Sequence, residues 1–148
     1  MSEEINLNQP IVRVFNLDND LDNCVQLFLS DFNLPEEDVR NFLLSINSNE
    51  STIAHLVLQD GKRIVAHGAV EQSTREPTKG GLNAIHATET TYLSTLLTSL
   101  SSNCKKNGIK TLYMNFTHLD NDSPQINPYK ALGFTYTGVD TRYKKEIE

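Results

Sequence analysis

Two segments of the chain place apolar residues three and four positions apart, the spacing that gathers them on one face of a helix. They are 21–32 and 90–107. Gly108 follows the second segment where a left-handed residue would end the helix. A third helix is predicted over 35–46, because Pro35 and the acidic pair after it suit the first turn of a helix and its dipole. The pattern therefore predicts three principal helices.

Short runs rich in β-branched and aromatic residues predict strands before, between and after these helices. The runs are 11–15, 52–58, 63–70, 82–87, 109–116, 134–137 and 141–145. Asp60 and Gly61 form a strong signal for a two-residue hairpin. The strands on either side of this pair are therefore expected to be antiparallel neighbours.

Proline and glycine mark two further breaks in the pattern. Pro77 and the pair Gly80-Gly81 predict a loop or a wide turn before the fourth strand. A short helix over 129–132 is expected to end at Gly133. This helix separates the fifth strand from the last two.

The elements follow one another as βααβββαβαβ, with one more strand expected at the end of the chain. A strand hairpin that leads into βαβαβ implies a mixed sheet with helices on both faces. No repeat or low-complexity linker divides the chain, and its 148 residues suit one compact domain. We therefore expect a single α/β (α+β mixed) domain over 11–148, preceded by a flexible N-terminal tail at 1–10.

Charge and cysteine content narrow the function classes. The formal net charge of −6 offers no basic field for nucleic-acid phosphates, so a nucleic-acid partner is not expected. Cys24 and Cys104 lie among apolar residues without a CxxC or Cys/His pattern, which favours two buried, reduced thiols. The N-terminus has no signal-peptide pattern, and no run of about 18 apolar residues could span a membrane. The expected location is the cytoplasm, with the nucleus as the alternative.

Four stretches of the sequence resemble the GNAT N-acetyltransferase family. LLTSLSSNCKKNGIKTLYMNF is similar to the family's long helix, glycine stop and following strand, and NPYKALGF to its tyrosine-bearing helix. LDNCVQLFLSDF and VLQDGKRIVAHGAV are similar to its opening elements. The resemblance covers about residues 11–145. It implies the GNAT fold, with a mixed, mostly antiparallel central sheet flanked by helices on both faces, and acetyl-CoA as cosubstrate without a metal.

The loop expected to hold the pyrophosphate of acetyl-CoA departs from the family pattern. In the family it reads Arg/Gln-x-x-Gly-x-Gly/Ala and opens the long helix, where backbone N–H groups face the phosphates. The matching positions here are Thr88, Thr91 and Leu93, so the basic residue and both small residues are absent. Glu89 would add negative charge beside the phosphates. The threonine hydroxyls could serve an anion site or cap the helix, and capping is favoured.

The resemblance also assigns the groups that would carry out the chemistry. Tyr129 matches the tyrosine that faces the CoA sulfur, and its phenol could protonate the departing thiolate. The alternative for Tyr129 is a ring that packs under the sheet. His86 and Glu89 lie near the expected thioester, and either could deprotonate an amine. The residues implied to contact acetyl-CoA are Ile85, Ala87, Thr88, Thr91, Tyr92, Leu93 and Asn121, with Asp122 as the alternative to Asn121.

Two functions compete for this sequence. The first is an N-acetyltransferase that modifies a primary amine of a small molecule or peptide, which would enter over 33–50 and 74–81. The net negative charge of the chain suits a cationic acceptor. The second is a catalytically inactive GNAT-like module whose splayed strands bind a peptide or a second copy, as in a homodimer. We prefer the acetyltransferase, because backbone groups that any residue supplies hold most of the pyrophosphate. A hydrolase finds no support, since no Gly-x-Ser-x-Gly occurs.

Overall fold

The computed structural model describes residues 9–115, 124–138 and 142–147. Its strands are β1 (Ile11–Val14), β2 (Thr52–Asp60), β3 (Arg63–Gln72), β4 (Lys79–Ala87), β5 (Thr111–Asn115), β6 (Thr135–Tyr136) and β7 (Arg142–Glu146). Its helices are α2 (Leu17–Asp31), α3 (Glu36–Ser48), α4 (Thr90–Lys106) and α5 (Asn127–Ala131), with a 3₁₀ turn at η1 (Pro124–Ile126). The predicted order of elements is confirmed. The predicted tail at 1–10 lies outside the described residues except for its last two positions.

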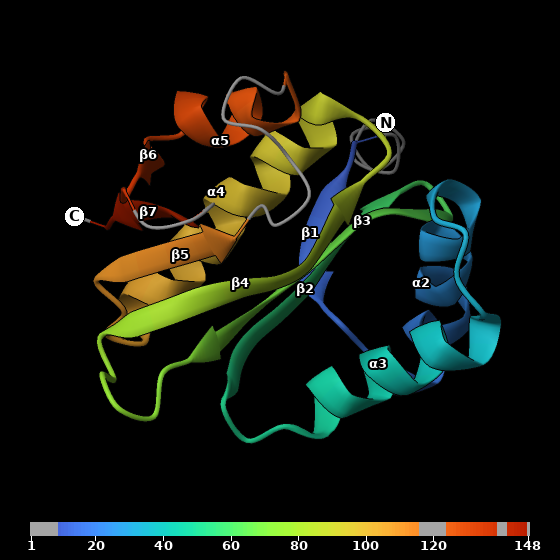
Figure 1. Cartoon of the computed structure of the whole chain (residues 1–148). Coiled ribbons are helices and arrows are strands. Elements are labelled where there is room, and N and C mark those ends of the chain that lie inside the picture. The colour runs from blue at the N-terminus through green and yellow to red at the C-terminus, as the bar shows by residue number, and fades with distance from the viewer. Residues whose placement is uncertain (1–8, 116–123, 139–141, 148) are drawn as a thin grey trace, which may run out of the picture.

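Within the described residues, all strands form one sheet in the order β1-β2-β3-β4-β5-β7-β6. The β4–β5 pair is parallel and the other pairs are antiparallel. The helices α4 and α5 cover one face of the sheet, whereas α2 and α3 pack on the other (Figure 1). The predicted mixed, mostly antiparallel sheet with helices on both faces is therefore confirmed.

Each face of the sheet has its own apolar core. Leu97 and Leu100 of α4 are buried in a cluster with Leu58 of β2, and on the opposite face Cys24 of α2 belongs to a cluster with α3 and β2. Cys24 and Cys104 are both buried and unpaired, as predicted, and burial raises the pKa of each thiol to about 12. No helix in the described part of the chain is long and apolar enough to cross a membrane.

The parallel strands β4 and β5 pair over only a short length. Their register joins Lys79–Gly81 to Thr111–Tyr113, and beyond Gly81 the edge of β4 has no strand partner among the described residues. The loop predicted before the fourth strand is confirmed at 73–78, but its extension over Gly80-Gly81 is wrong, because both glycines lie inside β4. Gly80 is needed there, since a Cβ would meet Cγ1 of Val70 at 2.8 Å. The separation of the two strands opens the sheet near the end of β4.

The end of β4 contains a bulge. Two residues, Ala84 and Ile85, lie opposite the single residue Gly68 of β3. Ala84 has a φ of 53°, the left-handed conformation that glycine usually adopts in such a bulge. For a residue with a Cβ this conformation costs about 1–2 kcal/mol. A Cβ at Gly68 would meet Cδ1 of Ile85 at 2.7 Å, so the glycine makes room for Ile85.

Candidate active site

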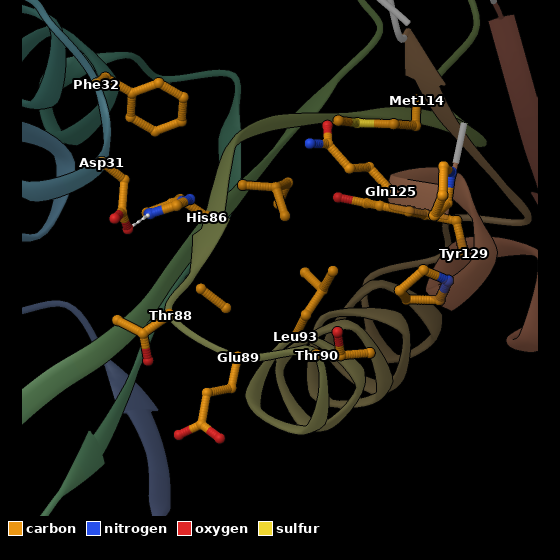
Figure 2. Close-up of a pocket in the computed structure, with 14 residues that line it drawn as sticks. Asp31, Phe32, His86, Thr88, Glu89, Thr90, Leu93, Met114, Gln125 and Tyr129 are labelled. Atoms are coloured by element: carbon orange, nitrogen blue, oxygen red, sulfur yellow. Dashed lines mark hydrogen bonds and ion pairs between the residues drawn. The ribbon is translucent and has the colours of Figure 1, made fainter. Parts of the chain in front are cut away.

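A cavity of about 650 Å³ opens where β4 diverges from β5, between the end of α2 and the start of α4 (Figure 2). Side chains from α2, β4, α4, β5 and α5 meet there, so residues far apart in the sequence share its wall. It is lined by Asp31, Phe32, Ile85, His86, Ala87, Thr88, Glu89, Thr90, Leu93, Met114, Pro124, Gln125, Pro128 and Tyr129.

His86 and Asp31 form a hydrogen-bonded pair on one wall of this cavity. Nε2 of His86 lies 2.6 Å from Oδ2 of Asp31, the last residue of α2, and the His86 side chain is 15% exposed. The rings of Phe28 and Phe32 pack against the imidazole at centroid distances of 5.7 and 4.8 Å. An ionised carboxylate only accepts hydrogen bonds, so Nε2 carries the proton and Nδ1 carries the lone pair of the neutral ring. The pair can therefore act as a fixed proton acceptor.

Tyr129 enters the cavity from the short helix α5. Its ring is 5% exposed and packs edge to face on Phe134 at a centroid distance of 5.7 Å. Figure 2 shows the phenol extending from α5 into the cavity, on the wall opposite His86 and Asp31. Burial raises the pKa of the phenol well above its ordinary value, so Tyr129 keeps its proton over the physiological pH range.

The start of α4 has no side-chain cap. Glu89 is the N-cap residue and makes no capping hydrogen bond, so the predicted threonine capping is wrong. The first bond within the helix joins the N–H of Leu93 to the carbonyl of Glu89 at 3.1 Å. The N–H groups of the first turn before Leu93 have no acceptor within the helix, which leaves them available to an anion at the mouth of the cavity. Figure 2 shows the carboxylate of Glu89 pointing away from Tyr129.

The structure brings together most of the residues that the sequence singled out. Ile85, His86, Ala87, Thr88, Glu89, Leu93 and Tyr129 all line the cavity. Thr91 and Tyr92 do not line it. The hydroxyl of Tyr92 instead donates to Oδ2 of Asp60 at 2.6 Å, which ties the first turn of α4 to the β2–β3 hairpin. Asn121 and Asp122 lie outside the described residues.

Sequence reasoning missed Asp31, which the structure makes the partner of His86. Asp31 lies at the end of an amphipathic helix, where a polar residue is ordinary, so its role becomes visible only when α2 packs beside β4. Phe32, Met114 and Gln125 were missed for the same reason, since each reaches the cavity from a different element.

A second cavity, of about 770 Å³, adjoins the first. It is lined by residues 71–76, 79–83, 113–115 and Arg142. Met114 lines both cavities, so the two are neighbours at the point where β4 and β5 separate. The carboxylate of Glu76 is paired with Lys79, whereas among the described residues Glu71 receives only a long contact of 3.4 Å from Asn49. In the part of the chain that the structure describes, no cluster of side chains could hold a metal ion.

The fold is that of the GNAT N-acetyltransferases. Solved structures of this class are similar to this chain. Aminoglycoside 6'-acetyltransferase type Ii shares 18% identity at a TM-score of 0.76, covering 93% of this chain and 97% of its own. The PaiA N-acetyltransferase from Thermoplasma acidophilum, in complex with coenzyme A, shares 15% identity at a TM-score of 0.69, covering 93% and 99%. The ribosomal-protein-S18-alanine N-acetyltransferase from Escherichia coli shares 16% identity at a TM-score of 0.71, covering 95% of both chains. No protein-family model and no curated protein matches the sequence.

Proposed function

We propose that this chain is an acetyl-CoA-dependent N-acetyltransferase that modifies a primary amine. The observation that carries the proposal is the arrangement of one cavity: a histidine fixed by a carboxylate lies on one wall, and a buried, protonated tyrosine lies on another. Acetyl transfer to an amine needs a proton acceptor for the nitrogen and a proton donor for the leaving sulfur. His86 and Tyr129 are suited to these two roles.

The hydrogen-bonding groups around the cavity fit acetyl-CoA. The negative charge of Glu89 fits its phosphates less well. Acetyl-CoA would supply an acetyl group activated as a thioester. The uncapped first turn of α4 offers backbone N–H groups to a pyrophosphate. Beyond Gly81, the edge of β4 that has no strand partner among the described residues offers backbone N–H and C=O groups to the amides of the pantetheine arm. Glu89 is an acid where the family pattern has none, and Leu93 takes the place of a small residue. We therefore expect the affinity for CoA to be modest.

The proton steps follow from the two side chains. Nδ1 of His86 accepts a proton from the acceptor's ammonium group, and the amine nitrogen can then attack the carbonyl carbon of the thioester as the carbon–sulfur bond breaks. The phenol of Tyr129 donates its proton to the leaving sulfur. The second proton of the attacking nitrogen restores the phenol, and His86 releases its proton to solvent. The raised pKa of Tyr129 favours the protonated phenol before and after the reaction.

The acceptor that this proposal favours is a primary amine of a small molecule or a peptide. Two of the similar structures are named for their acceptors: one for an aminoglycoside, the other for an alanine of a ribosomal protein. The second cavity reaches the first at Met114 and offers the carboxylate of Glu71 to an ammonium group. A homodimer and a cytoplasmic location stay predictions.

Titration calorimetry of the purified protein with acetyl-CoA and with CoA, at low and at moderate salt, tests the proposal first. Micromolar binding supports it and calls for a screen of amines that follows release of the free thiol. Absence of heat at sub-millimolar ligand contradicts it and favours the catalytically inactive module that binds proteins. Titration with ATP, which carries phosphates but no pantetheine, is the control for a general affinity of the α4 start for anions.

A further inference from the structure

Two histidines and one backbone carbonyl form a hydrogen-bonded chain across β2, β3 and β4. Nε2 of His55 lies 2.7 Å from Nε2 of His67, and Nδ1 of His67 lies 2.8 Å from the carbonyl oxygen of Ala84. His67 is completely buried. This row of hydrogen bonds therefore ends at Ala84. Among the described residues other than glycine, Ala84 is the one with a left-handed backbone conformation.

One arrangement of protons satisfies both bonds with neutral rings. The carbonyl of Ala84 can only accept, so Nδ1 of His67 must carry a proton and its Nε2 must accept. Nε2 of His55 must then donate, which leaves Nδ1 of His55 as a lone pair that has no hydrogen-bond partner among the described residues. Burial lowers the pKa of His55 to about 3 and that of His67 to about 4, which keeps both rings neutral.

Aromatic packing holds the two rings in place. Phe15 stacks on His55 at a centroid distance of 4.1 Å and an interplanar angle of 10°. The rings of Phe28 and His67 pack in a T-shaped pair at a centroid distance of 5.5 Å. The same Phe28 packs against His86 at 5.7 Å, so buried His67 and the cavity histidine share one aromatic neighbour.

The bulge at Ala84 determines on which face of the sheet the side chains at the end of β4 lie. Leu82 and Ile85 both pack against the core on the α4 side although they are three positions apart, whereas a regular strand returns to the same face every two positions. Ala84 packs into the α2–α3 cluster, and His86 meets Asp31 of α2. Without the extra residue, the positions after Ala84 would exchange faces, and His86 would point away from Asp31.

We propose that His67, oriented by His55, is a positioning residue that holds the β4 bulge at Ala84 and thereby keeps His86 against Asp31 in the cavity. Its hydrogen bond compensates for the strained backbone of an alanine at a position that glycine would occupy without strain. His67 does not line the cavity and acts through the backbone alone. The catalytic consequence rests on the proposed acetyltransferase function, whereas the structural consequence does not.

The first test does not depend on activity. Long-range ¹⁵N–¹H correlation spectra of the whole chain report the tautomer of each histidine, and we expect His67 as the Nδ1–H form and His55 and His86 as the Nε2–H form. In His67→Leu, which removes the donor, the His86 ring signals should shift towards those of a ring free of Asp31. In His67→Asn, whose amide N–H can replace Nδ1–H, they should stay near the wild type. An Nε2–H tautomer for His67 in the wild type overturns the proposal, even where the leucine variant fails to fold.

The second test uses the strain at Ala84. Glycine adopts a positive φ freely, so Ala84→Gly in the His67→Leu background should restore the His86 ring signals. Where acetyl transfer is measured, His67→Leu should lower kcat about 10- to 100-fold through misplacement of His86, with little change in the affinity for CoA. His67→Asn and the double variant should recover most of that loss. A folded His67→Leu protein with wild-type His86 signals overturns the positioning role. An inactive wild type with the expected tautomers overturns the acetyltransferase function alone.

Discussion

Oδ2 of Asp31 lies 2.6 Å from Nε2 of His86, although 55 positions of sequence separate the two residues. The contact forms because α2 ends beside the bulged end of β4, where the rings of Phe28 and Phe32 enclose the imidazole. One carboxylate therefore fixes the tautomer and the orientation of the histidine that we propose as the base, and it supplies the counter-charge when that ring is protonated.

Removal of the imidazole should abolish most of the activity. We expect His86→Ala to lower kcat about 100- to 10,000-fold, the usual contribution of a general base. Asp31→Asn should cause a smaller loss, because the amide oxygen can still accept from Nε2 but no longer stabilises an imidazolium. Steady-state rates of thiol release with saturating acetyl-CoA measure both effects.

The matched control for Asp31→Asn is Asp22→Asn. Asp22 lies on the same helix, is 84% exposed and pairs only with Arg40 among the contacts of the described residues. Equal losses in the two variants would show that the charge of α2, and not the contact with His86, changes the rate. Wild-type rates in His86→Ala would assign the base to another group, with Glu89 as the next candidate.

Tyr129→Phe should remove the proton donor and keep the packing. The ring contact with Phe134 survives the change, so the variant should still fold, which its thermal unfolding transition checks. We expect kcat to fall about 100-fold or more, while the affinity for CoA measured by calorimetry changes little. A rate that matches the wild type would falsify the role of Tyr129 as the acid and leave it as a packing residue.

The parts of the fold that local signals determine could be predicted from the sequence. Asp60-Gly61 marks the β2–β3 hairpin, where Gly61 has a φ of 64°, and Gly108 ends α4 with a φ of 81°. Gly80-Gly81 misled the prediction, because a glycine pair also occurs where strands approach closely. Val70 lies too near Gly80 for a Cβ to fit, and no local signal in the sequence reveals that contact.

The candidate site could be predicted only where the resemblance to a family reached it. Tyr129 and His86 follow from their positions relative to the glycine-bounded elements, and both line the cavity. The bulge at Ala84 could not be predicted, since alanine is unusual in a left-handed conformation and nothing nearby marks it. Asp31 and the pair of His55 and His67 depend on the register and packing of separate elements, which periodicity does not determine.

Glu89→Gln should strengthen the binding of CoA. Glu89 is the N-cap residue of α4 and lines the cavity, so its charge opposes a pyrophosphate at the first turn. We expect the Kd for CoA to fall about two- to five-fold at low salt, which corresponds to the usual effect of one charge at a helix end. The difference should shrink at higher salt because of screening.

The control for this change is Glu37→Gln, which removes the same charge from the first turn of α3, away from the cavity. An equal fall in Kd in the two variants would mean that net charge, and not the position of Glu89, sets the affinity. An unchanged Kd in Glu89→Gln would place the phosphates elsewhere.

The buried ring of His67 should make the protein less stable in mild acid. In the unfolded chain a histidine has an ordinary pKa of 6.5, whereas burial lowers the pKa of His67 to about 4 in the folded state. Above pH 6.5 neither state takes up the proton, so the full stability is present. Between pH 6.5 and about 4 only the unfolded chain takes it up, and the free energy of unfolding falls by up to about 1.4 kcal/mol per pH unit through His67 alone.

Urea unfolding of the wild type and of His67→Leu, at half-unit steps from pH 7.5 to pH 4.5, measures this slope. The leucine variant should be less stable at pH 7.5, because Nε2 of His55 loses its acceptor, and its stability should fall less steeply with pH. The two curves therefore converge as the pH falls. Parallel curves would show that His67 takes up its proton equally in both states, which a completely buried ring with both nitrogens in hydrogen bonds does not allow.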